Sequence, residues 1–232
     1  MRALVVGPGK MGREIEFVLA ERGHSIAGRI GRGSNLDGLV PNEIDVAFEF
    51  TVAAAAPALV EGLLSRGIPV VSGTTGWDLE GARALSHRRM VPFLHAPNFS
   101  IGVAAVRRAV TELSRALAPF PDFEPGILER HHSAKKDAPS GTALALEASI
   151  QQGRGRDATA PRVPIVSLRQ GGQPGEHIVI FEGAEESVEI VHRARSRSLF
   201  AAGAVSAAEW LLASGCRGPA SFDEFFDRRS PS

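Results

Sequence analysis

The segment 129–143 reads Glu-Arg-His-His-Ser-Ala-Lys-Lys-Asp-Ala-Pro-Ser-Gly-Thr-Ala and gathers the side chains of this chain that are best suited to chemistry. Its adjacent histidines, His131 and His132, can exchange protons near neutral pH, and Lys135 adds fixed positive charge. Ser140 then opens an apolar run, which predicts a helix whose first backbone N–H groups face the same place. Together these groups predict a site for a small substrate that carries carboxylates, with a proton donor beside them.

Two other interpretations of this segment are open. Adjacent histidines beside lysines also occur in solvated turns that bind nothing. A metal site is the weaker alternative, because neighbouring side chains on a strand point to opposite faces and the one thiol, Cys216, lies far along the chain. We therefore predict no metal site, and it is the N-terminal segment that favours a functional interpretation.

A short apolar strand at the N-terminus leads directly into Gly7-Pro-Gly-Lys-Met-Gly12. The spacing Gly-x-Gly-x-x-Gly permits a tight turn, the close approach of a pyrophosphate, and close packing of a helix on the strand. A helical pattern follows, with Ile15, Val18 and Leu19 on one face. Strand, glycines and helix in this order predict a dinucleotide-binding turn, and a purely structural glycine turn is the alternative.

The first part of the chain alternates strand and helix patterns. Alternating units of this kind predict a parallel sheet with helices on both faces, and ligands at the carboxyl ends of its strands. Three turns rich in Gly, Thr and Asn fall at such ends, namely 50–51, 73–75 and 96–99. The strands are expected at residues 3–6, 25–30, 44–50, 69–72 and 92–95, with helices between them that end near 22, 64 and 88.

The pattern changes after Asn98. A helix is expected at 103–117 and a strand at 123–129, and 151–161 is Gly/Arg-rich without periodicity, which predicts a mobile surface loop. Strand-like stretches follow in succession, which predicts an antiparallel or mixed sheet, before a final Ala-rich helix. These stretches are 163–169, 177–181 and 188–194, and the helix is 199–212.

Composition excludes several classes of function. The chain has 232 residues with 26 Lys+Arg and 26 Asp+Glu, so no net field favours nucleic acid or a membrane surface. A single cysteine allows no internal disulfide and fits a reducing compartment. No signal peptide and no uncharged apolar run long enough to span a bilayer are recognisable. We therefore expect a soluble cytoplasmic protein.

The glycine turn and the segment 129–143 together resemble the dihydrodipicolinate reductase family. More segments agree, and the matches keep the family's order along the chain: Phe50-Thr51, Gly73–Gly76, Ala96–Val103, Gly175–His177 and Arg197–Ala204. The resemblance implies reduction of 4-hydroxy-tetrahydrodipicolinate by NAD(P)H in the diaminopimelate route to lysine. In that reaction a hydride moves to C4 of a cyclic imine dicarboxylate, and a general acid supplies a proton.

The family's architecture also fits the element pattern. It implies an α/β chain with a Rossmann-type parallel-sheet domain and a smaller α+β substrate domain with an open mixed sheet. The first domain would comprise residues 1–98 and 204–232, and the second residues 99–203. Family members pair the open sheets, which implies a homotetramer.

The resemblance implies roles for individual residues. His131 and Lys135 match the catalytic proton donors. The substrate would be bound by His132, Ser140, Gly141, Thr142 and Thr75. Asp137 is expected to cap the following helix or fix the turn, and Lys136 and Arg195 are expected to be solvated. The cofactor would be bound by Gly7, Pro8, Gly9, Lys10, Met11, Gly12, Phe50, Thr51, Gly73, Thr74, Thr75, Ala96, Pro97, Asn98, Phe99, Arg197 and Phe200.

The choice between NADH and NADPH depends on the end of the second strand, where an acidic residue binds a ribose 2′-hydroxyl and an arginine accommodates a 2′-phosphate. This chain has Gly31 where the acid is expected, and Arg32 follows it. Arg29, at the end of the same strand, is a second candidate, and the alternative is that both arginines are solvated and contact no phosphate. We therefore expect NADPH to be preferred and NADH to be possible.

Two further functions compete with this interpretation. Another nicotinamide dehydrogenase, acting on an amino or imino acid, would share the glycine turn but has no reason to carry the His-His-x-x-Lys and Asp-Ala-Pro-Ser-Gly-Thr segments in this order. A catalytically idle NADP(H) sensor would tolerate the loss of His131 and Lys135, yet both are present.

Overall fold

The computed structural model describes residues 1–157 and 159–229, and the chain divides into two compact units. Unit 1 comprises Met1–Phe99 and the chain from Arg197 onward, and unit 2 comprises Ser100–Ser196. The return to unit 1 therefore begins at Arg197, whereas the predicted domain begins at 204. The reason is that helix α6 (Ser198–Ala213) is one continuous helix that packs on α1 of unit 1 (Lys10–Glu21).

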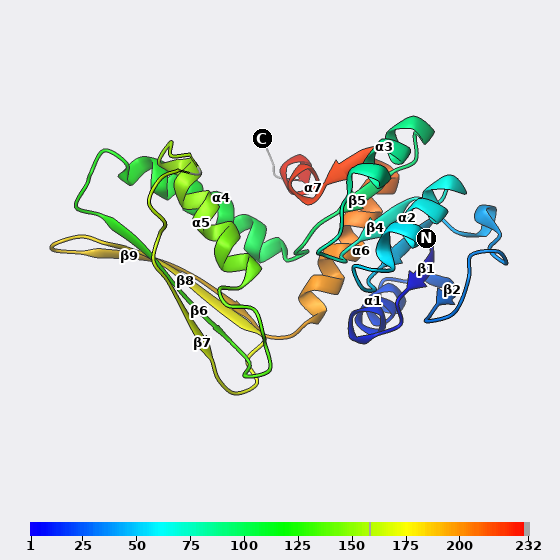
Figure 1. Cartoon of the computed structure of the whole chain (residues 1–232), viewed down its shortest axis with the longest axis horizontal. Helices are drawn as coiled ribbons and strands as arrows, with labels where there is room; N and C mark the ends of the chain where they lie inside the picture. The colour runs from blue at the N-terminus through cyan, green and yellow to red at the C-terminus, as the bar shows by residue number, and fades with distance from the viewer. Residues whose placement is uncertain (158, 230–232) are drawn as a thin grey trace. The chain divides into compact units, whose positions relative to one another are not determined.

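Unit 1 is built on a parallel sheet with the strand order β10-β5-β4-β3-β1-β2 (Figure 1). This confirms the predicted Rossmann-type sheet. Its strands are β1 (Arg2–Val6), β2 (Ser25–Ile30), β3 (Val46–Glu49), β4 (Val70–Ser72), β5 (Phe93–His95) and β10 (Pro219–Ser221). Its other helices are α2 (Ala56–Ser65), α3 (Glu80–Arg89), α7 (Phe222–Arg229) and a 3-10 turn, Pro41–Glu43.

Strand β1 shows why this sheet is buried on both faces. All four residues Ala3 to Val6 are at most 1% exposed, so side chains pointing to either face are covered. Leu4 and Val6 pack with Val60 of α2 and Ala82 of α3 in one apolar cluster. Such a continuous apolar strand matches the predicted βα alternation. Strand β10 and helix α7 are absent from our predicted elements. Strand β10 reads Pro-Ala-Ser and lacks the large apolar side chains by which the equally short β4 and β5 were recognised.

Unit 2 is a mixed sheet covered on one face by two helices, α4 (Ile101–Leu117) and α5 (Gly141–Gly153), which lie side by side in Figure 1. The strand order is β7-β6-β8-β9, with β6 and β7 parallel and the other neighbours antiparallel. This confirms the predicted open mixed sheet. The strands are β6 (Glu124–His131), β7 (Ile165–Arg169), β8 (Gly175–Glu182) and β9 (Ser187–Ala194).

Several predicted boundaries in unit 2 differ from the structure by one to three residues, and two of the differences bear on the site and on the predicted loop. Strand β6 continues to His131 instead of ending at Glu129, so the histidine belongs to the sheet. Helix α5 continues to Gly153, which places the first three residues of the predicted loop 151–161 in a helix. The glycine lets α5 approach α4 closely, since a Cβ at Gly153 would lie 2.3 Å from the carbonyl oxygen of Thr111. Ala158 of that loop lies outside the described residues.

Within the described ranges 1–157 and 159–229, no helix has the length and apolar character needed to cross a bilayer.

Candidate active site

The three glycines of the N-terminal turn have different structural roles. Gly7 has φ of +94°, and a Cβ there would lie 2.3 Å from the carbonyl oxygen of Phe50. A Cβ at Gly12 would lie 2.4 Å from the carbonyl oxygen of Gly7. Gly9 is exposed, with no atom within 4 Å of a Cβ built on it, and it precedes the first turn of α1. The turn thus needs Gly7 and Gly12 for its own packing, whereas Gly9 faces open space that a ligand could occupy.

This open space belongs to a hollow of about 520 Å³ in unit 1. The carboxyl ends of β1, β3 and β4 and the start of α1 meet there, as expected for a parallel sheet. All but two of its lining residues were predicted to bind the cofactor. The lining consists of Gly9, Lys10, Met11, Phe50, Thr51, Val52, Ala53, Gly73, Thr74 and Thr75.

The predicted cofactor residues 96–99 do not line this hollow. Ala96 and Phe99 are buried, and the ring of Phe99 packs against Phe50 with ring centroids 5.7 Å apart. The carbonyl oxygen of Phe99 lies where a side chain at Gly203 would be, only 1.8 Å from a Cβ built there. Phe99 therefore supports the hollow through Phe50. Pro97 is exposed and Asn98 is half-buried, while Arg197 is the exposed N-cap of α6 and Phe200 is half-buried in its first turn.

Glu49 is a residue of this site that the sequence interpretation missed. It ends β3 and is fully buried, and its carboxylate accepts hydrogen bonds from Ser72 Oγ (2.6 Å), Thr74 Oγ1 (2.7 Å) and the backbone N–H of Thr51 (3.0 Å). The Thr51 hydroxyl also donates to it. The carboxylate thus ties together the ends of β3 and β4 that form the hollow. A charged residue within the apolar run Val46–Phe50 was the available signal.

The two candidate arginines for a 2′-phosphate differ in their surroundings. Arg29 donates to both carboxylate oxygens of Glu16 on α1, at 2.8 and 3.0 Å. Arg32 is exposed in the turn after β2, where the backbone N–H of Ser34 donates to the carbonyl of Gly31 (3.2 Å). A Cβ at Gly31 would lie 3.7 Å from the ring of Pro8, so this turn adjoins the glycine turn. Arg29 is thus already engaged by Glu16.

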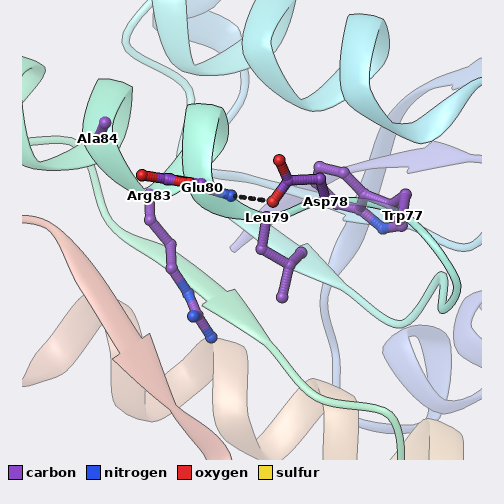
Figure 2. A pocket seen from close by; sticks show the side chains of 6 residues that line it. All are labelled: Trp77, Asp78, Leu79, Glu80, Arg83 and Ala84. Atoms are coloured by element: carbon purple, nitrogen blue, oxygen red, sulfur yellow. Dashed lines mark hydrogen bonds between the residues drawn. The ribbon is translucent and has the colours of Figure 1, made fainter.

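A second hollow in unit 1, of about 580 Å³, lies beside the start of α3 (Figure 2). There the backbone N–H of Glu80 donates to Asp78 (3.0 Å). None of its six lining residues was predicted for the site: Trp77, Asp78, Leu79, Glu80, Arg83 and Ala84. Although it is the larger of the two, only the hollow at Gly9 coincides with chemistry predicted from the sequence.

In unit 2 the end of β6 places Glu129 and His131 on the same, helix-covered face, because they are two residues apart on one strand. The Glu129 carboxylate binds Nδ1 of His131. Its other oxygen accepts from Arg169 of β7 (2.6 Å) and from the backbone N–H of Ser140 (3.3 Å). Glu129 is a second buried acid that the sequence interpretation did not assign. Its signal was the i, i+2 spacing, which became visible once His131 was known to lie on the strand.

His177 on β8 completes this cluster. The strand register pairs Glu129 with His177 and His177 with His192 of β9, so these three residues form one row across the sheet. The ring centroids of His131 and His177 lie 5.1 Å apart, and the two rings meet edge to face. Ser140 Oγ lies 3.1 Å from Nε2 of His177. The sequence comparison within 175–177 pointed to a family match here without assigning a role to His177.

The loop between β6 and α5 carries the other predicted residues. Lys135 Nζ lies 2.8 Å from both carboxylate oxygens of Asp137. The N-cap of α5 is Ser140, whose hydroxyl accepts from the backbone N–H of Ala143 (3.2 Å). Of the two roles predicted for Asp137, capping this helix is wrong, because Ser140 is the cap and the Asp137 carboxylate binds Lys135. Its role in fixing the turn stays a prediction. His132 and Thr142 are half-buried, and Gly141 and Lys136 are exposed.

Burial, hydrogen bonds and neighbouring charges shift the pKa values of the groups in this cluster. Burial alone would raise the pKa of Glu129, but hydrogen bonds from Arg169, Ser167 and His131 lower it to about 2, so the carboxylate is ionised at neutral pH. Burial lowers the pKa of His131, against the opposing effect of Glu129. Burial and the positive charge of neighbouring groups lower the pKa of His177 to about 4, so this ring is neutral.

Glu129, His131 and His177 are also the residues whose donor atoms could hold a metal ion, since these atoms lie within 4.8 Å of one another. The donors are already used within the protein, however. The carboxylate binds His131 and Arg169, and His177 lies within hydrogen-bond distance of Ser140. The arrangement is therefore a hydrogen-bonded network around one histidine, and the expected absence of a metal stays a prediction.

Sequence profiles of known families cover nearly the whole chain. One, described as "Dihydrodipicolinate reductase, N-terminus", matches residues 1–99. Another, described as "Dihydrodipicolinate reductase, C-terminus", matches residues 102–224. The chain belongs to the dihydrodipicolinate reductase family. It is accordingly an oxidoreductase, and unit 1 is the nucleotide-binding Rossmann domain of this family.

Curated relatives support this assignment. The 4-hydroxy-tetrahydrodipicolinate reductase of Christiangramia forsetii is 36% identical over 220 residues, which is 91% of this chain and 92% of the relative. The enzyme of the same name from Rubrobacter xylanophilus is 40% identical over 251 aligned positions, covering 92% of this chain and 94% of the relative. The family resemblance inferred from the sequence motifs is thereby confirmed.

The fold agrees with a solved member of the family. The dipicolinate-bound dihydrodipicolinate reductase of Paenisporosarcina sp. TG-14 superposes with a TM-score of 0.72 at 22% sequence identity, over 95% of this chain and 97% of the other. At this identity the likeness concerns the fold. It confirms the predicted combination of a Rossmann-type sheet and a mixed sheet.

Proposed function

We propose that this chain reduces 4-hydroxy-tetrahydrodipicolinate to tetrahydrodipicolinate in diaminopimelate and lysine biosynthesis. The observation that carries the proposal is the network at the end of β6, in which an ionised, buried Glu129 holds His131 on the strand that leads into Lys135. The glycine hollow of unit 1 supplies the matching nucleotide site.

Each group has a distinct part in the proposed reaction. The C4 hydroxyl of the substrate must leave as water, and a bound reduced nicotinamide would supply the hydride that adds to C4 of the dehydrated, conjugated imine. His131 and Lys135 supply the proton that the reduced substrate requires. The substrate carboxylates are bound by His132, Ser140, Gly141 and Thr142 at the start of α5, where the helix dipole favours negative charge. Thr75, which lines the nucleotide hollow of unit 1, is also proposed as a substrate-binding residue.

The residues around the first hollow fit a dinucleotide. Gly9 leaves room for a pyrophosphate beside the start of α1, where backbone N–H groups and the helix dipole favour phosphate. Lys10, Met11, Thr51 and Gly73 line the same space. Gly7, Pro8 and Gly12 form the turn. Phe50 lines the hollow, Phe99 packs against Phe50, and Ala96 is buried near the end of β5. We propose NADPH as the preferred cofactor, with NADH also possible.

Cofactor preference gives a first prediction. An arginine–phosphate contact is charge-assisted and can be bidentate, so it should discriminate by about 1–3 kcal/mol, roughly a ten- to hundredfold preference for NADPH in kcat/KM. Replacing Arg32 by alanine should bring the two cofactors close together. Arg29→Ala should do less, because Arg29 is paired with Glu16. Steady-state kinetics with each cofactor measure both effects, and equal use of NADH and NADPH by the unmodified protein would contradict the proposal.

The direct test of the function follows NADPH oxidation with freshly generated 4-hydroxy-tetrahydrodipicolinate, with dicarboxylate-free controls. We expect rapid oxidation that requires the substrate. Oxidation only with other amino or imino acids would favour a different dehydrogenase. Binding of NADPH without turnover of any substrate would favour the idle sensor.

We further propose a homotetramer in the cytoplasm. The sheet face of unit 2 opposite α4 and α5 exposes apolar side chains, including Val166 (62% exposed) and Leu168 (40% exposed) on β7, and family members pair sheets of this kind. Light scattering after size exclusion should give four times the chain mass of 24.6 kDa. A monomeric mass would contradict the assembly, and cell fractionation checks the location.

A further inference from the structure

We propose that Glu129 is a positioning residue: its carboxylate binds Nδ1 of His131 and thereby leaves the transferable proton at Nε2. This inference rests on the proposed function, and it adds a residue that acts through His131 without touching the substrate. The motif analysis gave Glu129 no role. A role follows from three observations: Glu129 is buried, both of its carboxylate oxygens have hydrogen-bond partners, and Nε2 of His131 packs against Gly175.

The carboxylate of Glu129 is held in one orientation. Oε1 accepts hydrogen bonds from Arg169 (2.6 Å) and from the backbone N–H of Ser140 (3.3 Å), and Oε2 contacts His131. Arg169 is fixed in turn, because it also donates to the carbonyl oxygen of Asp137 (2.6 Å). Arg169 and the N–H of Ser140 therefore hold Oε1 in place, and Oε2 faces Nδ1 of His131 as a hydrogen-bond acceptor. A neutral His131 must therefore carry its hydrogen on Nδ1.

The other ring nitrogen is kept accessible by a glycine. A Cβ built on Gly175 of β8 would lie 2.9 Å from Nε2 of His131, closer than such contacts normally allow. Any side chain at this position would therefore press on Nε2. Glu129 on one side and Gly175 on the other define which nitrogen of His131 is bound and which is left for proton transfer.

The charges around His131 make Glu129 necessary for its protonation. Burial lowers the pKa of His131, and so do Lys135 in the following loop and Arg169 on β7. His177 faces the ring from β8 and is neutral near pH 7. Glu129 is the group that raises the pKa of His131, through its hydrogen bond and its charge. Without that charge, the imidazolium form loses its main stabilisation.

Glu129→Gln should move the hydrogen of the neutral His131 ring from Nδ1 to Nε2. The amide oxygen of the glutamine must face Arg169 and the N–H of Ser140, because both are donors, so its NH₂ group faces Nδ1. Nδ1 can then only accept, and the hydrogen of the neutral ring moves to Nε2. Protonation would bring two donors together at Nδ1, so the pKa of His131 should fall by about one to three units, the usual effect of losing an adjacent opposite charge.

The first measurement is the pH dependence of kcat/KM. A general acid must be protonated to act, so kcat/KM falls as the pH rises through the pKa of His131. In Glu129→Gln this fall should occur about one to three pH units lower. Glu129→Asp keeps the charge but withdraws it from Nδ1, so it should give an intermediate shift, and it replaces Glu129→Gln if that variant does not fold.

Glu147→Gln is the matched control. Glu147 lies on α5, is likewise buried, and its carboxylate is likewise paired with an arginine, Arg162, and with the backbone N–H of Val163 (3.2 Å). Its replacement removes the same charge from the same unit without contacting His131. We expect lower stability and an unchanged pH profile. An equal shift in both variants would show a general effect of charge and overturn the proposal.

The second measurement reads the tautomer without any substrate. With ¹⁵N-labelled histidine, long-range ¹H–¹⁵N correlations should show His131 protonated at Nδ1 in the unmodified protein and at Nε2 in Glu129→Gln. His131→Gln assigns the signal. This result stands even if the protein fails to oxidise NADPH, which would count against the function only. An unchanged tautomer with an unchanged pH profile would overturn the positioning role while leaving the function intact.

Discussion

Replacing His131 by glutamine is expected to lower kcat by about a hundredfold or more, the size of effect expected for a general acid. The ring is 7% exposed and anchored at Nδ1, so no neighbouring group can take its position. Lys135→Met should have a loss of similar size, since its ammonium is held on the adjoining loop by Asp137. Steady-state kinetics at saturating NADPH measure both.

His132→Ala is the comparison for these two variants. His132 matches a substrate-binding position, and its backbone N–H is engaged by the carbonyl oxygen of Gln173 (2.8 Å), so the loop should keep its course without the ring. We expect its KM to rise more than its kcat falls. If His131→Gln raised KM and spared kcat, His131 would be a binding residue and the proposed proton donor would be wrong.

The second large effect concerns the glycine turn, where two glycines should respond in opposite ways. Gly7→Ala places a Cβ 2.3 Å from the carbonyl oxygen of Phe50 at φ of +94°. Backbone strain and overpacking should together cost about 3 kcal/mol, which lowers Tm by roughly 6–12 °C in a chain of this length. Gly9→Ala meets no atom within 4 Å, so Tm should stay unchanged while NADPH binding weakens.

Thermal unfolding and NADPH titration of both variants separate these effects. The pair is informative because the two residues belong to one motif and receive the same methyl group. A lower Tm in Gly9→Ala would mean that Gly9 does not face open space. An unchanged NADPH affinity in that variant would mean that Gly9 does not face the pyrophosphate. The hollow would then hold the cofactor in another way.

The fold was largely predictable from the sequence, because buried strands and amphipathic helices carry strong periodic signals. The failures occurred where the signal is weak or depends on distant partners. Strand β10 reads Pro-Ala-Ser and carries no large apolar side chain, unlike the equally short β4 and β5. The residue at which β6 ends depends on its pairing with β7 and β8, so local propensity could not predict it.

The site was predicted unevenly for the same reason. His131, Lys135 and the glycine turn lie in local motifs, so the sequence alone was enough to name them as candidates, and their roles stay predictions. Glu49 and Glu129 were missed because their function depends on partners distant in the sequence, such as Ser72 and Arg169. Asp137 was expected to cap α5 or to fix the turn before it, and the structure shows that Ser140 is the cap while the Asp137 carboxylate binds Lys135.

The row formed by Glu129, His177 and His192 ties the appearance of activity to the order of folding events. Strand β6 pairs with β8 across the intervening α5 and β7, whereas β8 and β9 form a local hairpin, and a slip of one residue in β8 would turn His177 to the opposite face. Long-range pairings of this kind form late, because the chain must first close large loops. A refolding chain should therefore regain helix signal before it regains catalysis, and a chain trapped in the wrong register would be compact and inactive.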